Sequence, residues 1–371
     1  MKNIAIISPN KNAYSETFIK AHIKYLRGNI HYIYGGFPFK TSDKKGSLLS
    51  YYHKYNFFSK VIKFFPVFIY NRLFYKSHSD YFEFYLKREK IDIVLADDGL
   101  TGALNLSVIK KLKIPLITYF FGGDSSIRST LETNFKKYND MFVYAEKVLV
   151  VSNEMKERII DLGCKSSKII VNQCPPNDMF FKIQPNFSKK QFLAIGRFVD
   201  IKAPYFTILA FSKIAIIHDD ARLIILGDGP LLYTCKNLAK YLNVIDKIDF
   251  RGVVPQEEYK SLFAESLAFV QHSITIETGD MEGTPVAILE ASASGLPVIS
   301  TNHAGIPEVI INEKTGLLVE ETDVNGMSKN MIKVIDNVDY AKKLGAAGKD
   351  FVKKNFRMKN HIKIIQDLID M

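Results

Sequence analysis

Two glutamates in one short segment carry the chemistry that stands out in this sequence. Glu282 and Glu290 lie eight positions apart in GDMEGTPVAILEASASGLPVIS, on either side of a Gly-Thr-Pro turn. A carboxylate offers hydrogen-bond acceptors and no donor, so it suits the vicinal diol of a sugar ring. Spacing alone leaves an alternative, in which Glu282 favours a helix dipole and Glu290 faces solvent.

The segment between the glutamates predicts a helix start and, with it, an anion site. Thr284 is a good N-cap and Pro285 fits the first helical position, so we expect a helix from there to just before Gly295. The free amides of Val286 and Ala287 then point out of a positive helix end, where a phosphate binds well. A phosphate flanked by diol-binding carboxylates describes a nucleotide sugar.

Two basic residues add to this chemistry. AIGRFVDIKAP carries Arg197 and Lys202 in a loop between a predicted strand and a predicted helix. Two cations at such a place can bind a diphosphate and stabilise its charge as it leaves. A solvated basic loop is the alternative. The glycines of LGDGP at 226–230 permit close backbone approach to a ligand, although many turns look the same.

Strands alternate with helices along the whole chain, which is typical of α/β architecture with parallel sheets. A chain of 371 residues is too long for one ordinary core. A run rich in Pro, Asn and Lys interrupts the alternation, so we divide the chain into an N-terminal domain at 1–176, a linker at 177–190, a second domain at 191–350 and a C-terminal segment at 351–371.

Apolar runs and their breakers predict the elements of both halves. In the first half we expect strands at 3–8, 91–96, 115–120, 148–151 and 169–172, and helices at 16–25, 103–112 and 153–162. In the second half we expect strands at 192–195, 222–226, 248–251 and 268–272, and helices at 203–215, 231–242 and 256–264. Ligands of open α/β sheets bind beyond the carboxyl ends of the strands, so the polar candidates should gather there.

The formal net charge of +11 favours an anionic partner. Between 40 and 90, about eleven Lys and Arg residues stand against four acidic ones and are interleaved with Phe and Tyr. This composition suits an anionic membrane surface, and an amphipathic helix pair with core aromatics is the alternative. The first apolar run is too short for a signal peptide. The three cysteines lack metal spacing, so we expect no zinc site. We therefore expect a cytoplasmic protein that is bound peripherally to the inner face of the plasma membrane.

Several segments resemble one known family. IGRFVDIKAP, LGDGP, DFRGVVP, MEGTPVAILEASASGLPVIST and HAGIPEVI occur in the order and spacing of the retaining family-4 glycosyltransferases. The resemblance covers most of residues 148–360, and SETFIKAHIKYL looks like the family's bacterial exopolysaccharide and lipopolysaccharide enzymes. It implies the α/β GT-B fold, in which two Rossmann-like doubly wound domains face a central cleft and the C-terminal segment crosses back to the first domain.

The resemblance also implies an activity and a set of roles. The activity is retaining transfer of a hexose from a UDP- or GDP-sugar to a lipid-linked or saccharide acceptor in cell-surface polysaccharide synthesis, without metal or cofactor. Arg197 and Lys202 would bind the donor diphosphate, and Glu290 would bind the ribose hydroxyls. Glu282 would bind the transferred sugar, and backbone near Val254 the base. Donor contacts are further expected from Gly283, Thr284, Pro285, Val286 and Ala287, and the catalytic candidates are Glu282, Arg197 and Lys202.

The first domain departs from the family pattern. Many members carry His-Gly-x-Asp where this chain reads FGGD, so Phe121 replaces the histidine and Asp124 is retained. The front-face mechanism of the retaining enzymes uses the leaving phosphate to take the acceptor proton, so this change need not abolish transfer. We place Phe121, Gly122 and Asp124 on the acceptor side with Ser15 and Glu16, although Ser15 is equally a helix N-cap.

Other functions fit the sequence less well. A GT-B nucleotide-sugar epimerase shares the fold, but the spacing of the two glutamates with the two cations argues against it. A dinucleotide oxidoreductase would need G-x-G-x-x-G after a first strand, which neither PNKNAY nor IGRFVD provides. A catalytically silent sugar-nucleotide-binding homologue stays open because of Phe121. No recognisable motif for reading nucleic acid is present.

Some polar residues have an open or modest role. His272 and His303 end predicted strands at the cleft edge, and contact with a ligand is one possibility beside a structural one. Glu308 precedes an apolar helix, where an acid favours the dipole. Asp97 and Asp98 form no convincing metal pair, which fits a metal-independent enzyme.

Overall fold

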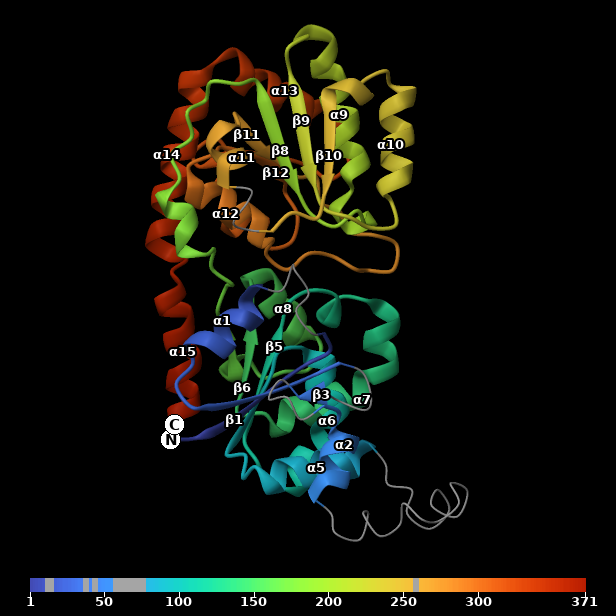
Figure 1. Cartoon of the computed structure of the whole chain (residues 1–371), viewed down its shortest axis with the longest axis vertical. Helices are drawn as coiled ribbons and strands as arrows, with labels where there is room; N and C mark the ends of the chain where they lie inside the picture. Colours follow the sequence, from blue (N-terminus) through green and yellow to red (C-terminus); the bar gives the residue numbers. More distant parts are fainter. Residues whose placement is uncertain (11–16, 36–39, 42–45, 56–77, 256–259) are drawn as a thin grey trace.

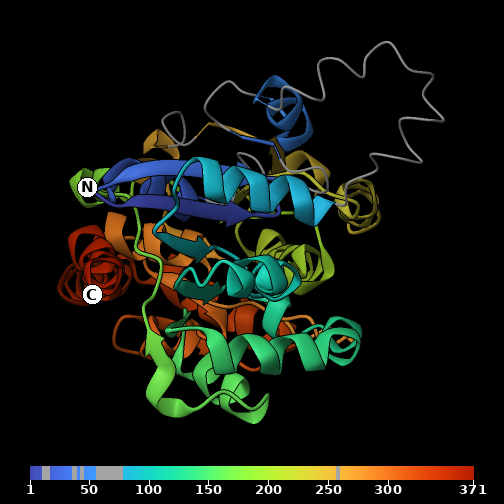
Figure 2. The same cartoon turned by 90° about the horizontal axis from the view of Figure 1, so that it is seen from below.

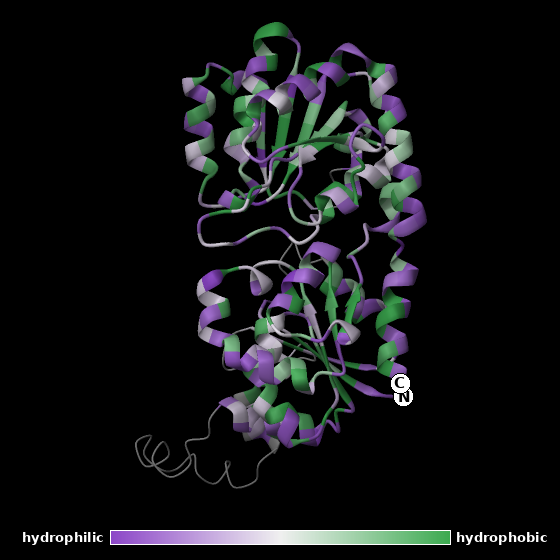
Figure 3. Ribbon diagram, turned by 180° about the vertical axis from the view of Figure 1, so that it is seen from behind, coloured by the Kyte–Doolittle hydropathy of each residue, from purple (hydrophilic) through white to green (hydrophobic). Residues whose placement is uncertain are grey.

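The chain folds into two α/β domains that are stacked along its long axis (Figure 1). The structure is a computed structural model and describes residues 1–10, 17–35, 40–41, 46–55, 78–255 and 260–371. In each domain the strands at the centre are apolar, while the helices around them alternate apolar and polar residues (Figure 3). This is the layered arrangement that alternating strands and amphipathic helices predict.

The N-terminal sheet has seven strands in the order β3-β2-β1-β4-β5-β6-β7, all parallel except β3. Continuous apolar runs form its centre because helices cover both faces. The sequence did not predict β2, whose first residues are partly exposed, or the two-residue strand β3. The strands are β1 (Asn3–Ser8), β2 (Asn29–Tyr34), β3 (Lys40–Thr41), β4 (Ile93–Ala96), β5 (Leu116–Phe120), β6 (Lys147–Val150) and β7 (Ile169–Val171).

The helices of this domain follow the predicted alternation. They are α1 (Thr17–Tyr25), α2 (Leu48–Tyr55), α5 (His78–Arg88), α6 (Gly99–Lys111), α7 (Arg128–Tyr144) and α8 (Asn153–Asp161). Helix α6 begins at Gly99, before the expected 103, because the Asp98 side chain accepts a hydrogen bond from the Thr101 amide at 2.6 Å and caps the helix.

The described aromatics of the basic region 40–90 belong to the core. Tyr51 and Tyr85 are each at most 1% exposed, and their rings lie 4.9 Å apart between α2 and α5. The core alternative is therefore correct for these side chains. The rest of that region, 42–45 and 56–77, lies outside the described residues. No helix among the described residues combines the length and the apolar composition that a membrane crossing needs.

The C-terminal sheet has six parallel strands in the order β10-β9-β8-β11-β12-β13. Its strands are β8 (Gln191–Ile195), β9 (Arg222–Leu226), β10 (Ile248–Gly252), β11 (Ala268–Val270), β12 (Val298–Thr301) and β13 (Gly316–Val319). Its helices are α9 (Pro204–Ile217), α10 (Leu232–Tyr241), α11 (Lys260–Glu265), α12 (Val286–Ser294), α13 (Val324–Asp336) and α14 (Val338–Asn355).

Segments on either side of the C-terminal domain connect it to the first. Within the expected linker, Phe180 and Ile183 are buried in the C-terminal core, so this part packs as one of its elements. After α14, helix α15 (Met358–Asp370) crosses back, and Ile365 and Ile369 are buried in the N-terminal core (Figures 1 and 2). The chain thus passes between the domains twice, which ties their relative placement at two points.

Candidate functional site

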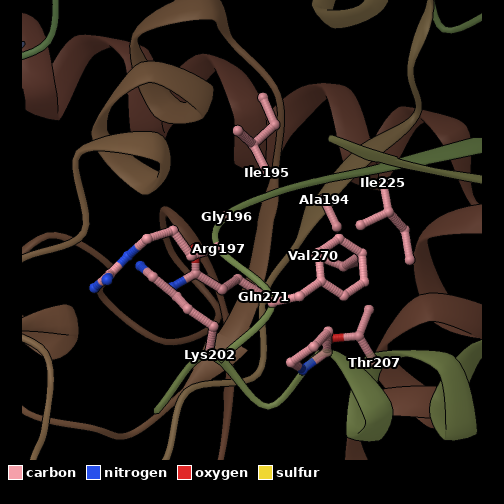
Figure 4. A pocket seen from close by; sticks show the side chains of 11 residues that line it. Ala194, Ile195, Gly196, Arg197, Lys202, Thr207, Ile225, Val270 and Gln271 are labelled. Atoms are coloured by element: carbon pink, nitrogen blue, oxygen red, sulfur yellow. The ribbon is translucent and has the colours of Figure 1, made fainter. Parts of the chain in front are cut away.

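A pocket opens at the carboxyl end of β8, where the sequence predicts the donor site. Arg197 and Lys202 line it together with backbone at Gly196 and with Thr207 and Gln271 (Figure 4). The side chains of Arg197 and Lys202 point to the same side (Figure 4). Two positive groups therefore face one space at the end of a parallel sheet, which is where ligands of open α/β sheets bind.

Lys202 and Glu282 form an ion pair across the site. The Lys202 Nζ lies 2.8 Å from a Glu282 carboxylate oxygen, and the two side chains are 15% and 10% exposed. Desolvation offsets much of the attraction in such a sheltered pair, so it adds little to stability. The structure brings together two residues that the sequence places eighty positions apart and assigns to one site.

Acidic side chains beside this pair shape the local charge. Burial and the neighbouring Glu282 carboxylate raise the pKa of Asp280, and the Arg197 guanidinium opposes that rise. The exposed Arg197 is thus close enough to influence the same carboxylate cluster. The site therefore carries charges of both signs. Its cations can bind a diphosphate, and its carboxylates can accept hydrogen bonds from sugar hydroxyls.

The glutamate helix differs from expectation at its first residue. Thr284 does not cap α12, since its hydroxyl donates to the Val151 carbonyl of the other domain at 2.9 Å. Pro285 occupies the N-cap position, and the helix begins at Val286. The amides of Val286 and Ala287 still lie in the first turn, where helix geometry leaves N–H groups without intrahelical acceptors. The anion site predicted for this helix start therefore keeps its donors.

Glu290 lies on the buried side of α12. It is 4% exposed, so the solvent-facing alternative is wrong. A carboxylate is rarely buried to this extent unless its oxygens have polar partners. Glu290 thus faces the interior of the domain, and its contact with a ribose stays a prediction.

The glycines around the site allow close backbone contacts between chain segments. An added Cβ at Gly227 would lie 1.9 Å from the Gly196 carbonyl oxygen, and Gly227 has φ of +132°. The LGDGP turn thus lets β8 and β9 end close together, so its glycines serve protein packing. Val254, the candidate for the base, follows β10 at the same end of the sheet and is half-buried.

Glu308 plays a different part from the one that the sequence predicts. Its carboxylate accepts hydrogen bonds from the amides of Asn153 at 2.6 Å and Glu154 at 3.2 Å, at the start of α8. The Asn153 side chain and Gln173 add two more at 2.9 and 3.2 Å. The acid therefore favours a helix dipole in the opposite domain, and it connects the two domains.

The two histidines at the cleft edge accept backbone hydrogen bonds. The Nε2 of His272 accepts from the Thr322 amide at 2.9 Å, and the Nε2 of His303 accepts from the Glu282 amide at 3.1 Å. Burial lowers the pKa of His272 to about 4, so it stays neutral. Both rings therefore hold chain segments, and the partner of His303, Glu321, had no signal in the sequence.

The acceptor-side candidates lie at the facing edge of the N-terminal domain. The Phe121 ring stacks between Phe18 and Tyr119, with centroids at 4.0 and 4.3 Å. An added Cβ at Gly122 would lie 3.5 Å from the Met281 carbonyl oxygen, so this backbone approaches the loop that carries Glu282. Ser15 and Glu16 lie outside the described residues.

Asp124 is half-buried in the loop after β5. Its carboxylate accepts hydrogen bonds from the amides of Gly99, Gly122 and Phe121 at 2.9, 2.9 and 3.2 Å. Burial and the nearby Asp98 carboxylate raise the pKa of Asp124 to about 7. These contacts fold the loop after β5 onto the start of α6, so Asp124 has a structural role, and its place on the acceptor side stays a prediction.

The raised pKa of Asp124 predicts a pH-dependent stability. The folded protein holds this proton more tightly than the unfolded chain, so the contribution is largest near pH 4 and is lost as the pH rises to about 7. Between these pH values, the free energy of unfolding should fall by roughly 2–4 kcal/mol less in Asp124→Asn than in the wild type. Urea unfolding at pH 4.5 and 8 measures it. Asp140→Asn, at an exposed position, is the control and should keep the wild-type pH dependence.

Two family models match the chain, one for each domain. Residues 18–175 match Glycosyltransferase Family 4, and residues 177–351 match Glycosyl transferases group 1. Among the described residues, no group of three or more His, Cys, Asp and Glu side chains is arranged to hold a metal ion.

Relatives and solved structures agree with these matches. The amylovoran biosynthesis glycosyltransferase AmsK of Erwinia amylovora is 32% identical over 248 residues, which are 66% of this chain and 61% of AmsK. The putative colanic acid biosynthesis glycosyltransferase WcaL of Escherichia coli is 29% identical over 247 residues, covering 65% of this chain and 61% of WcaL. The chain thus spans about three fifths of the length of these relatives.

The solved structures show a shared fold over the whole chain. Anabaena HepE in complex with UDP and glucose has a TM-score of 0.78 at 13% identity, covering 100% of this chain and 99% of HepE. The lipopolysaccharide outer core galactosyltransferase WaaB has a TM-score of 0.68 at 18% identity, with 99% of both chains covered. The two-domain arrangement is common to all three proteins.

Proposed function

The chain belongs to the family-4 glycosyltransferases and has the GT-B fold, and from this premise we propose that it transfers a hexose from a nucleoside diphosphate sugar with retention of anomeric configuration. The acceptor is a lipid-linked or saccharide molecule in the synthesis of a cell-surface polysaccharide. The observation that carries the proposal is the Lys202–Glu282 pair at 2.8 Å, in which Glu282 lies in the loop that leads into α12.

Different residues of the proposed donor site bind different parts of the nucleotide sugar. Arg197, Lys202 and the amides of Val286 and Ala287 bind the diphosphate, because they supply positive charge where negative charge develops on the leaving group. Glu290 accepts hydrogen bonds from the ribose, and backbone near Val254 meets the base. Glu282 accepts from hydroxyls of the transferred sugar, so the two glutamates hold rings on either side of the diphosphate.

The proposed mechanism needs no side-chain base at position 121. The phenyl ring of Phe121 can neither take nor give a proton. A front-face reaction avoids that need, since an oxygen of the leaving diphosphate takes the proton of the acceptor hydroxyl as the new bond forms. Two cations already neutralise the leaving group, so transfer is proposed to be metal-independent.

The names of relatives support the substrate classes. AmsK and WcaL are named for the synthesis of amylovoran and colanic acid, and a 34% identical segment of 166 residues belongs to a GDP-mannose-dependent mannosyltransferase of Mycobacterium tuberculosis. HepE was solved with UDP-glucose. We therefore propose a UDP- or GDP-sugar as donor. A peripheral position at the inner face of the plasma membrane, reached through the basic region 40–90, would bring the enzyme to a lipid-linked acceptor.

Release of nucleoside diphosphate tests the proposal. The wild-type protein is mixed with UDP- and GDP-hexoses and with bacterial membrane lipid as acceptor, and free UDP or GDP is measured with Mg²⁺ or with EDTA. We expect one donor to be consumed at similar rates in both conditions, with lipid required for fast release. No release from any donor would contradict the transferase proposal, and release only with Mg²⁺ would contradict metal independence.

A further inference from the structure

The loop that carries Glu282 has little regular structure of its own. No helix or strand is assigned between β11 and α12, although Glu282 must be placed accurately against Lys202 and the donor. The loop turns tightly on itself, with the Ile276 amide donating to the Asp280 carbonyl at 3.1 Å. The loop lies between the two domains (Figure 1). Backbone bonds hold it at some points, such as the Ile274 amide to the Ile201 carbonyl at 3.1 Å, and side chains that bind its backbone hold it at others.

One carboxylate, that of Glu321, reaches both ends of this loop. It accepts hydrogen bonds from the amide of Thr275 at 2.8 Å and from its hydroxyl at 3.2 Å. A Glu321 oxygen also lies 2.6 Å from the Nδ1 of His303, and the Nε2 of that ring accepts from the Glu282 amide at 3.1 Å. Glu321 thus holds Thr275 directly and Glu282 through His303, and these two loop residues lie seven positions apart.

The hydrogen-bond partners of His303 determine which of its ring nitrogens carries the proton. An ionised carboxylate can only accept, so the proton of the neutral ring must lie on Nδ1. The Nε2 lone pair is then free to accept from the Glu282 amide, which is a donor only. The ring is 2% exposed, and water does not compete for these contacts.

We propose that Glu321 and His303 are positioning residues for the transfer reaction, which fix Glu282 through its backbone. The inference rests on the proposed function for what Glu282 does, but the coupling itself is a property of the loop. Glu321 acts by selecting the His303 tautomer that accepts from Glu282. It touches neither diphosphate-binding cation, so it should affect the sugar end of the donor more than the nucleotide end.

Glu321→Gln tests this coupling with little change in shape. The amide presents one acceptor and one donor to two groups that both donate, so either the Thr275 contact is lost or the His303 tautomer reverses. Reversal would place an Nε2–H against the Glu282 amide. Glu320→Gln is the matched control, because Glu320 is an exposed neighbour that accepts from Asn302 instead.

Turnover, nucleotide binding and hydrogen exchange are measured on both variants. In Glu321→Gln we expect kcat to fall about 10- to 100-fold, in line with misplacement of a reacting group by less than about 1 Å. Affinity for UDP or GDP alone should stay within about twofold, and amide exchange of peptides covering 274–284 should accelerate. Glu320→Gln should match the wild type in all three.

The outcomes separate this inference from the proposed function. Unchanged kcat in Glu321→Gln would overturn the positioning role, as would an equal loss of kcat and nucleotide affinity with a lower melting temperature, since that indicates general damage. Unchanged exchange at 274–284 would overturn the coupling. A wild-type protein that cleaves no nucleotide sugar would contradict the proposed function, while faster exchange confined to Glu321→Gln would still support the coupling.

Discussion

Lys202→Met is expected to lower the kcat/KM for the nucleotide-sugar donor by about 10²- to 10³-fold. Methionine keeps the length and apolar stem of lysine but removes the charge that stabilises the departing diphosphate. It also leaves the 10% exposed Glu282 carboxylate without the cation that lies 2.8 Å away. The variant thus loses an attraction to the leaving group and gains a repulsion beside it.

The control for this change lies in the same domain. Lys213→Met removes a positive charge from an exposed position on α9, where the ammonium donates to Asn325 at 2.7 Å, and it should leave kcat/KM unchanged. Initial rates of UDP or GDP release give the comparison. A loss of less than about threefold in Lys202→Met, or an equal loss in Lys213→Met, would contradict the role given to Lys202.

Gly283→Ala is expected to reduce transfer by about 10²-fold while leaving nucleotide binding largely intact. An added Cβ would lie 2.1 Å from the Phe121 carbonyl oxygen and 2.6 Å from the Val151 side chain, both in the opposite domain. A backbone oxygen cannot move aside as the end of a long side chain can. The methyl group must therefore push the two domains apart or displace the loop that carries Glu282.

Two measurements distinguish this effect from simple unfolding. The donor diphosphate contacts proposed here all come from the C-terminal domain, so the affinity for UDP or GDP should change by less than about threefold. Small-angle scattering should show a compact particle with a radius of gyration equal to or slightly above that of the wild type, whereas unfolding would raise it about threefold. Wild-type turnover in Gly283→Ala would mean that the close contact between the domains is not needed for the reaction.

Sequence patterns predicted the elements whose signals are local. Buried parallel strands read as apolar runs because both faces are covered, and β1 and β9 match their predicted bounds at 3–8 and 222–226. Strand β2 was missed because NIHYIY mixes polar and aromatic residues near the edge of the sheet. The family resemblance added the roles of the cations and the glutamates, which spacing alone left open.

The errors about polar site residues share one physical origin, which is contact between segments far apart in the chain. Thr284 looks like an N-cap because a hydroxyl before a helix usually accepts from it, but here the hydroxyl donates to Val151. Glu308 looks like an acid for its own helix, and it serves α8 instead. Glu321 carries no local signal at all, since its partners Thr275 and His303 become neighbours only in the folded sheet.

Calorimetric titration of UDP- and GDP-sugars into the protein tests the central claim most directly. We expect one donor class to bind the wild type, and the affinity to fall at least about tenfold in Glu290→Gln and in Lys202→Met, since each removes a charge-assisted contact. Lys213→Met should bind as the wild type does. Absence of binding for every nucleotide sugar, or equal affinity in the wild type and both site variants, would contradict the assignment of this site to a nucleoside diphosphate sugar.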